Sequence, residues 1–154
     1  MDFGLSNEQE MIIDTVKNFV EQELYPHEDE VEKSNHIDES LAESIKKKAI
    51  QLGLYATNMP EEYGGGGLDT LTLCLLEKEL GKANFGLQYI VARPSNILMA
   101  CKGDQIDKYL IPTIRGEKVD CLAMTEPNAG SDVRSMQCRA EKDGDFFVIN
   151  GSKH

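Results

Sequence analysis

The sequence has no tryptophan and few aromatic residues, which make up 6% of its 154 residues. It is also poor in positive charge, with 16 Lys and Arg against 27 Asp and Glu and a net charge of −11. So acidic a protein repels phosphate backbones and anionic lipids, which argues against a nucleic-acid partner and a membrane surface. A polyanionic small ligand would need a local site of backbone N–H groups and hydroxyls.

Cysteine and histidine are scarce and scattered. The four cysteines form no Cys-x-x-Cys pair, and they are Cys74, Cys101, Cys121 and Cys138. This spacing predicts reduced, mostly buried thiols, and the three dispersed histidines add no metal site. Long apolar runs and a basic-then-apolar leader are absent as well, so we expect no membrane span and a cytoplasmic location.

The N-terminal part of the sequence has helical periodicity. A capping box begins at Ser6 and predicts a helix over about 7–25, and a short exposed helix is possible within 27–36. Asp38 and Asp69 are predicted N-caps of two further amphipathic helices. The predicted inward-facing residues of these two helices are Leu41, Ala42, Ile45, Ala49 and Leu52, and then Leu71, Leu75, Leu76 and Leu80.

Glycine and proline divide the rest of the helical part. The run Gly64 to Gly67 lacks the Gly-Lys-Ser/Thr ending of a phosphate-binding loop, so we interpret it as a structural loop. Pro94 should kink or split an apolar helical stretch over about 85–101. A last helix, from about 103, is expected to end at Pro112. Its predicted inward-facing residues are Ile106, Tyr109 and Leu110.

Beyond about residue 118 the periodicity becomes strand-like. Residues 119–124 form one predicted strand, and 136–142 and 146–149 form two more around an Asp143-Gly144 hairpin turn. Because the edges of three such short strands are uncovered, we expect this segment to be poorly ordered or paired with a second copy.

The predicted fold is therefore mainly α. We expect an N-terminal helical-bundle domain over 1–117, followed by the first strands of an antiparallel β domain over 118–154.

Three motifs stand out in this order along the chain. They are Pro60-Glu61-Glu62-Tyr63-Gly64-Gly65, then Met124-Thr125-Glu126-Pro127-Asn128-Ala129-Gly130-Ser131-Asp132-Val133, then Ile149-Asn150-Gly151-Ser152-Lys153. The central motif suits a turn that presents backbone N–H groups to an anion, although by itself it also fits an ordinary loop. With the three motifs at this spacing, the sequence resembles the acyl-CoA dehydrogenase family of flavoenzymes from Phe3 to His154.

The resemblance implies an N-terminal helical bundle, FAD as cofactor and α,β-dehydrogenation of an acyl-CoA thioester in fatty acid metabolism. In that reaction a carboxylate removes the α-proton while the β-hydrogen leaves as hydride to the flavin. By position in the family's flavin loop, the implied cofactor-binding residues are Leu122, Ala123, Met124, Thr125, Gly130 and Ser131. Ser131 is also the implied substrate contact, because its hydroxyl can donate to a phosphate.

No catalytic residue is assigned. The family's catalytic glutamate lies in a C-terminal helical domain beyond His154, and a Trp-Ile-Thr segment that touches the flavin would follow Lys153. We interpret Glu126 as a loop-fixing hydrogen-bond acceptor rather than a general base. The chain alone is therefore expected to be an inactive, truncated part of the enzyme.

Arg93 is a second candidate for substrate binding. In the family the corresponding helix lines the acyl pocket, where an Arg would pair with a polar or carboxylated acyl group. A surface Arg beside the kink at Pro94 is the alternative.

The resemblance also implies an acyl-CoA substrate, an electron-transferring flavoprotein as partner and, for full-length members, a homotetramer. Two alternatives stay open. An acyl-CoA oxidase or an enoyl-CoA reductase uses similar loops and differs in its electron acceptor. A non-catalytic helical module that binds acyl-CoA or another protein belongs to a different class, and flavin retention would discriminate it.

Overall fold

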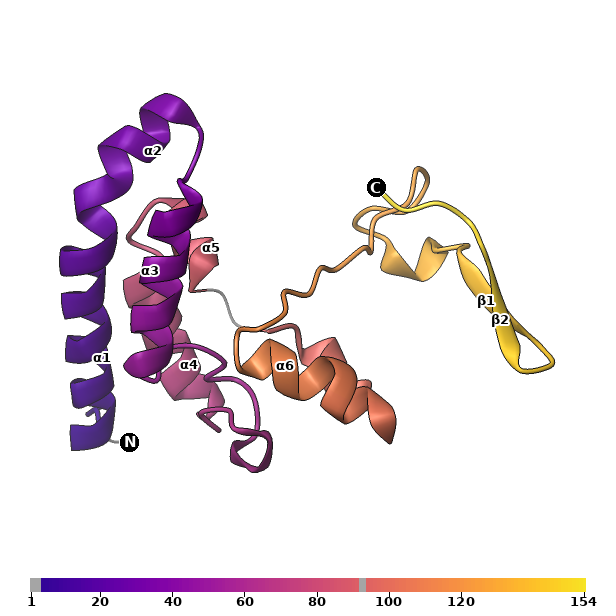
Figure 1. Cartoon of the computed structure of the whole chain (residues 1–154), viewed down its shortest axis with the longest axis horizontal. Coiled ribbons are helices and arrows are strands. Elements are labelled where there is room, and N and C mark those ends of the chain that lie inside the picture. The colour runs from indigo at the N-terminus through magenta and orange to yellow at the C-terminus, as the bar shows by residue number, and fades with distance from the viewer. Residues whose placement is uncertain (1–3, 92–93) are drawn as a thin grey trace. The chain divides into compact units, whose positions relative to one another are not determined.

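The structure is a computed structural model that describes residues 4–91 and 94–154, so Arg93 lies outside the described residues (Figure 1). The chain divides into two compact units, Met1–Asp120 and Cys121–His154. The first unit is helical, and the second contains a helical turn and a two-stranded sheet. A mainly α fold followed by antiparallel strands was predicted and is confirmed, while the boundary at 117 stays a prediction.

The first unit begins with a long run of helical residues. Its elements in order are α1 (Asn7–Phe19), a π-helical segment (Val20–Leu24), a 3-10 turn (Tyr25–His27) and α2 (Glu28–Ser34). The predicted capping box is present, since the Ser6 hydroxyl accepts from the Gln9 N–H at 3.2 Å and the Gln9 side chain accepts from the Ser6 N–H at 3.1 Å. Both helices predicted in this stretch are therefore confirmed.

The rest of the unit is built from shorter elements. They are α3 (Glu39–Gln51), a 3-10 turn (Glu61–Tyr63), α4 (Thr70–Leu80), α5 (Phe85–Ile90), a 3-10 helix (Asn96–Ala100), a π-helical segment (Ile106–Leu110) and α6 (Ile111–Ile114). Asp38 caps α3 by accepting from the Ser40 N–H at 2.9 Å, and Asp69 caps α4 by accepting from the Leu71 N–H at 2.8 Å. α5 ends before Pro94, so the split predicted there is confirmed.

Two apolar clusters hold this unit together. α1 packs against α4, and α3 against α5 (Figure 1). The larger cluster includes Val16, Phe19, Leu24, Ile45, Ala49, Leu76, Leu80 and Leu87. The smaller one consists of Ala56, Met59, Leu110 and Ile114. No helix in the described ranges is long and apolar enough to cross a membrane.

Some predicted inward-facing residues are exposed instead. Leu52 is the C-cap of α3 and Leu71 lies in the first turn of α4, and their side chains are 52% and 56% exposed. Tyr109 is 43% exposed, and its ring lies 5.4 Å from the Lys118 ammonium. Pro112 does not end the last helix, because it lies within a continuous helical run, in α6 directly after the π-helical segment Ile106–Leu110.

The glycine run packs tightly against its own loop. A Cβ on Gly65 would lie 2.2 Å from the Met59 carbonyl oxygen, and one on Gly66 would lie 2.9 Å from the Thr57 Cα. The structural interpretation of this run is therefore confirmed, because only glycine allows the two backbones to approach so closely.

The second unit contains a 3-10 turn (Val133–Ser135) and a hairpin of β1 (Arg139–Asp143) and β2 (Phe146–Asn150). The strands are antiparallel, with Glu141 opposite Val148, and Gly144 adopts a φ of 58° in the turn. The strand predicted over 119–124 is wrong. No described residue pairs with that segment in a ladder, and Val119 is 77% exposed.

Candidate functional site

The predicted ligand loop forms a tight turn in the second unit. The Glu126 N–H donates to the Ala129 carbonyl at 2.9 Å, and the Ala129 N–H donates back to the Glu126 carbonyl at 3.1 Å. Pro127 and Asn128 therefore occupy the tip of the turn, in agreement with the turn expected from their residue types.

The Glu126 side chain is buried beneath this turn. It is 8% exposed, and its carboxylate accepts from the backbone N–H of Gln137 at 2.7 Å, from that of Cys138 at 2.9 Å and from the Lys153 ammonium at 2.8 Å. The Gln137 N–H, and after it Lys153, lower the pKa of Glu126 to about 2. A carboxylate with so low a pKa is a poor general base at neutral pH. The interpretation of Glu126 as a loop-fixing acceptor is confirmed.

The third motif is tied to the second by Lys153 and by His154, the residue that follows the motif. The Lys153 ammonium also donates to the Met124 carbonyl at 3.0 Å, and the His154 N–H donates to the Thr125 carbonyl at 2.9 Å. Sequence reasoning connected the two motifs only through the family resemblance and missed the pairing of Lys153 with Glu126. The two residues are 27 positions apart, and no local pattern indicates such a contact.

The six predicted cofactor residues all lie in this loop and are exposed. They are Leu122, Ala123, Met124, Thr125, Gly130 and Ser131. A Cβ added to Gly130 would meet no atom within 4 Å. Nothing in the described part of the chain hydrogen-bonds the hydroxyls of Thr125 and Ser131, which leaves both available to a ligand. Arg93, the other predicted site residue, lies outside the described residues.

A hollow of about 300 Å³ adjoins the loop within the second unit. Its lining includes Asn128, Arg139, Asn150 and Ser152. Arg139 already pairs with Glu141, with 2.9 Å between Nε and Oε1. The hollow offers polar donors beside the turn, but its one guanidinium is shared with a carboxylate.

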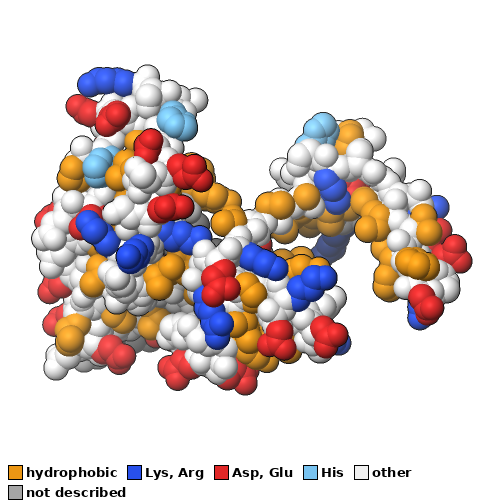
Figure 2. All heavy atoms as spheres, in the orientation of Figure 1, with side chains coloured by type: hydrophobic (Ala, Val, Ile, Leu, Met, Phe, Trp, Pro, Cys, Tyr) orange, Lys and Arg blue, Asp and Glu red, His pale blue; other side chains and the backbone are white. Residues whose placement is uncertain are grey.

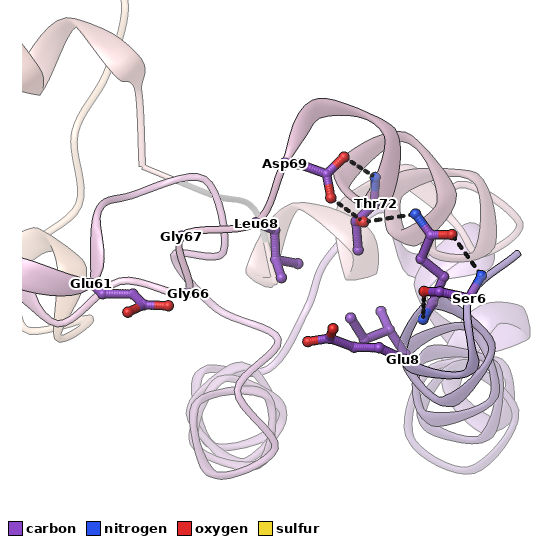
Figure 3. Close-up of a pocket in the computed structure, with 10 residues that line it drawn as sticks. Ser6, Glu8, Glu61, Gly66, Gly67, Leu68, Asp69 and Thr72 are labelled. Carbon is purple, nitrogen blue, oxygen red and sulfur yellow. Dashed lines mark hydrogen bonds between the residues drawn. The ribbon is translucent and has the colours of Figure 1, made fainter.

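A second hollow, of about 270 Å³, lies in the first unit where α1 and α4 begin (Figure 3). Glu8, Glu61 and Asp69 make it acidic. The close-up shows hydrogen bonds that link the starts of the two helices, with the Thr72 hydroxyl donating to Asp69 at 2.5 Å and accepting from Gln9 at 3.3 Å. We interpret it as a junction between helices. Among the described residues no three His, Cys, Asp or Glu side chains gather as metal ligands.

The helical part of the chain matches the model of the acyl-CoA dehydrogenase N-terminal domain over residues 6–117. The protein therefore belongs to the acyl-CoA dehydrogenase family, as its three motifs predicted. The site loop lies beyond the matched range, so its role rests on its own geometry and on the resemblance.

Relatives along the whole chain have different names at similar identity. A 3-(aryl)acrylate reductase of Clostridium sporogenes is 34% identical over 153 residues, which covers 96% of this chain and 40% of that protein. The mitochondrial isovaleryl-CoA dehydrogenase of Bos taurus is 37% identical over 155 residues, which covers 97% of this chain and 36% of that protein. The chain thus spans well under half the length of these relatives.

Solved structures agree in fold. One, described as the electron transferring flavoprotein of Acidaminococcus fermentans, has a TM-score of 0.80 and 34% identity, covering 99% of this chain and 40% of that chain. The acyl-CoA dehydrogenase of Bacillus anthracis complexed with FAD has a TM-score of 0.76 and 29% identity, covering 97% of this chain and 26% of that chain.

Proposed function

We propose that this chain is the N-terminal part of an FAD-dependent acyl-CoA dehydrogenase, an oxidoreductase acting on CH–CH bonds, and that its second unit supplies the flavin loop. The observation that carries the proposal is the exposed loop Leu122–Ser131 on a chain of this family. The family membership and the Bacillus anthracis relative complexed with FAD support it. Because the chain spans about 40% of its relatives' length, the whole reaction is proposed for the complete enzyme.

The residues of the loop suit a flavin nucleotide. The Thr125 and Ser131 hydroxyls are free donors, and Gly130 leaves room for close approach of a phosphate. Bound FAD would supply the acceptor for the hydride, while these residues bind and orient it. We assign no catalytic base, since the Glu126 carboxylate already accepts hydrogen bonds from three donors.

The first test is flavin retention by the 154-residue chain. The chain is mixed with excess FAD and gel-filtered, and the visible absorbance and mass of the protein peak are recorded. We expect stoichiometric flavin. A colourless peak contradicts flavin binding by this chain alone and makes it a structural part of the enzyme, while retained flavin argues against the non-catalytic module that binds acyl-CoA or another protein.

Gly130→Ala is the sharpest variant for the loop. Gly130 has open space around its Cβ position and no positive φ, so the substitution should leave the melting temperature unchanged. If the backbone approaches the flavin there, the added methyl group should weaken FAD binding by about tenfold or more. Equal FAD affinity in Gly130→Ala and wild type would remove Gly130 from the site.

Reduction is a second candidate for the direction of the reaction. One relative is named 3-(aryl)acrylate reductase, which favours considering reduction of a C=C bond beside dehydrogenation. Another similar structure is described as an electron transferring flavoprotein, and we propose a protein of that class as electron partner of the tetrameric full-length enzyme. Oxygen reactivity of the reduced full-length enzyme would separate an oxidase from a dehydrogenase and from a reductase.

The cytoplasmic location stays a prediction.

Arg93 is proposed to select the acyl group. If its guanidinium pairs with a carboxylated acyl chain, Arg93→Ala in the full-length enzyme should raise KM for carboxylated acyl-CoAs selectively. An equal change in KM for butyryl-CoA would remove Arg93 from the substrate site.

A further inference from the structure

The loop Leu122–Ser131 is held by a partly buried ion pair between Glu126 and Lys153. The side chains of Glu126 and Lys153 are 8% and 26% exposed, and their charged groups are 2.8 Å apart. Solvent and salt screen such a pair much less than a surface pair. The two residues come from separate motifs, so their contact fixes the segment around Lys153 against the turn that contains Glu126.

This pair also makes hydrogen bonds to the backbone around the loop. Glu126 takes both N–H groups of Gln137 and Cys138, and Lys153 takes the carbonyl of Met124. The hydroxyls of Thr125 and Ser131 point to no partner among the described residues. The bonds of Glu126 and Lys153 therefore set the shape of the loop, while its exposed hydroxyls remain for a ligand.

We propose that Glu126 and Lys153 are positioning residues that hold the loop Leu122–Ser131 in the shape required for flavin binding, without touching the ligand themselves. This inference rests on the proposed function for its ligand. The ion pair itself does not, because it is a contact between two side chains of the folded chain.

The experiment measures loop order and flavin affinity separately in the 154-residue chain. Amide hydrogen exchange by NMR reports the N–H groups of Gln137, Cys138 and His154 without flavin. FAD titration reports affinity. The variants are Glu126→Gln, Lys153→Met and Lys153→Arg. The matched controls are Asp145→Asn and Lys142→Met, which change the same charges at exposed positions of the same unit.

Removing either charge should speed exchange at Gln137 and Cys138 by about tenfold or more, because hydrogen bonds to a charged group are the stronger ones. FAD affinity should fall in the same variants. Lys153→Arg should restore both readouts, since it keeps the charge and can still reach the carboxylate. The two controls should match wild type.

The other outcomes are equally informative. Loss of FAD affinity with unchanged exchange would overturn the inference, because it would place Glu126 or Lys153 on the ligand. Unchanged exchange and affinity would overturn it as well, as would fast exchange at these amides in wild type. If exchange responds as expected but wild type binds no FAD, the ion pair still holds the loop, and flavin binding by the 154-residue chain is what fails.

Discussion

The charge of Glu126 makes its surroundings sensitive to acid. Its folded pKa, about 2, lies below the ordinary value of 4.5, so the ionised carboxylate favours the folded loop. This stabilisation is complete above pH 4.5 and is lost as the pH falls toward 2. Besides Lys153, His154 also contacts the loop, through its backbone N–H, which donates to the Thr125 carbonyl.

We therefore expect the amide NMR signals of Gln137 and Cys138 to shift with a midpoint near pH 2 during an acid titration. Glu126→Gln removes the titrating group and should remove this transition. A midpoint near 4.5 in wild type would show that the carboxylate lacks the donors described here.

Gly65 is a residue where the backbone tolerates no side chain. Its added Cβ would lie 2.2 Å from the Met59 carbonyl oxygen, which cannot move without shifting the buried Met59. We expect Gly65→Ala to lower the free energy of unfolding by about 2 kcal/mol or more, measured by urea denaturation. Gly130→Ala serves as control, and equal stability of the two variants would contradict the tight packing.

At the scale of elements, α4 provides a matched pair of leucines. Leu76 is 2% exposed in the main cluster, whereas Leu71 is 56% exposed. We expect Leu76→Ala to cost about 3 kcal/mol of stability because it leaves a cavity. Leu71→Ala should stay within about 0.5 kcal/mol of wild type. Similar losses in both variants would mean that the first turn of α4 is buried.

The helix starts were predictable, and the helix ends were less so. Ser6, Asp38 and Asp69 cap their helices through their own side chains, a signal that is local in sequence. The exposure of Leu52 and Leu71 depends on where neighbouring elements stop, which periodicity does not contain. The strand expected over 119–124 failed for a related reason, because an apolar run forms a strand only if another backbone pairs with it.

The candidate site also has features that the local sequence predicts and one that it does not. The turn of the central motif and the acceptor role of Glu126 follow from residue type and from the family resemblance. The contact of Lys153 with Glu126 joins positions 27 residues apart. Nothing local in the sequence encodes it, and only the folded backbone reveals it.

At the scale of the molecule, the hairpin exposes an apolar strand. Phe146, Phe147 and Ile149 of β2 are 77%, 67% and 72% exposed, and hydrophobic side chains are visible on the surface of this unit (Figure 2). The prediction that residues 119–154 are poorly ordered or paired with a second copy stays open. Antiparallel pairing of two β2 strands about their central residue would place Val148 opposite its own copy.

If the second copy pairs through β2, the mass of the chain in sedimentation experiments should rise with concentration toward a dimer. Val148→Lys should shift this equilibrium toward monomer, because two like charges would meet at the two-fold axis. Lys142→Met serves as control on the neighbouring strand. A concentration-independent monomer with a protected hairpin would contradict both alternatives.

The π-helical segment Val20–Leu24 has a consequence for how the chain tolerates changes in length. A π turn holds one residue more than an α turn, so it acts as a single-residue insertion in the helical run from α1 to the 3-10 turn Tyr25–His27. Deleting one residue there would convert the π turn into an α turn and leave the phase of the residues that follow nearly unchanged. Val31 would then keep its place in the main cluster. The segment is therefore a position where the helix can lose one residue without turning α2 out of the core.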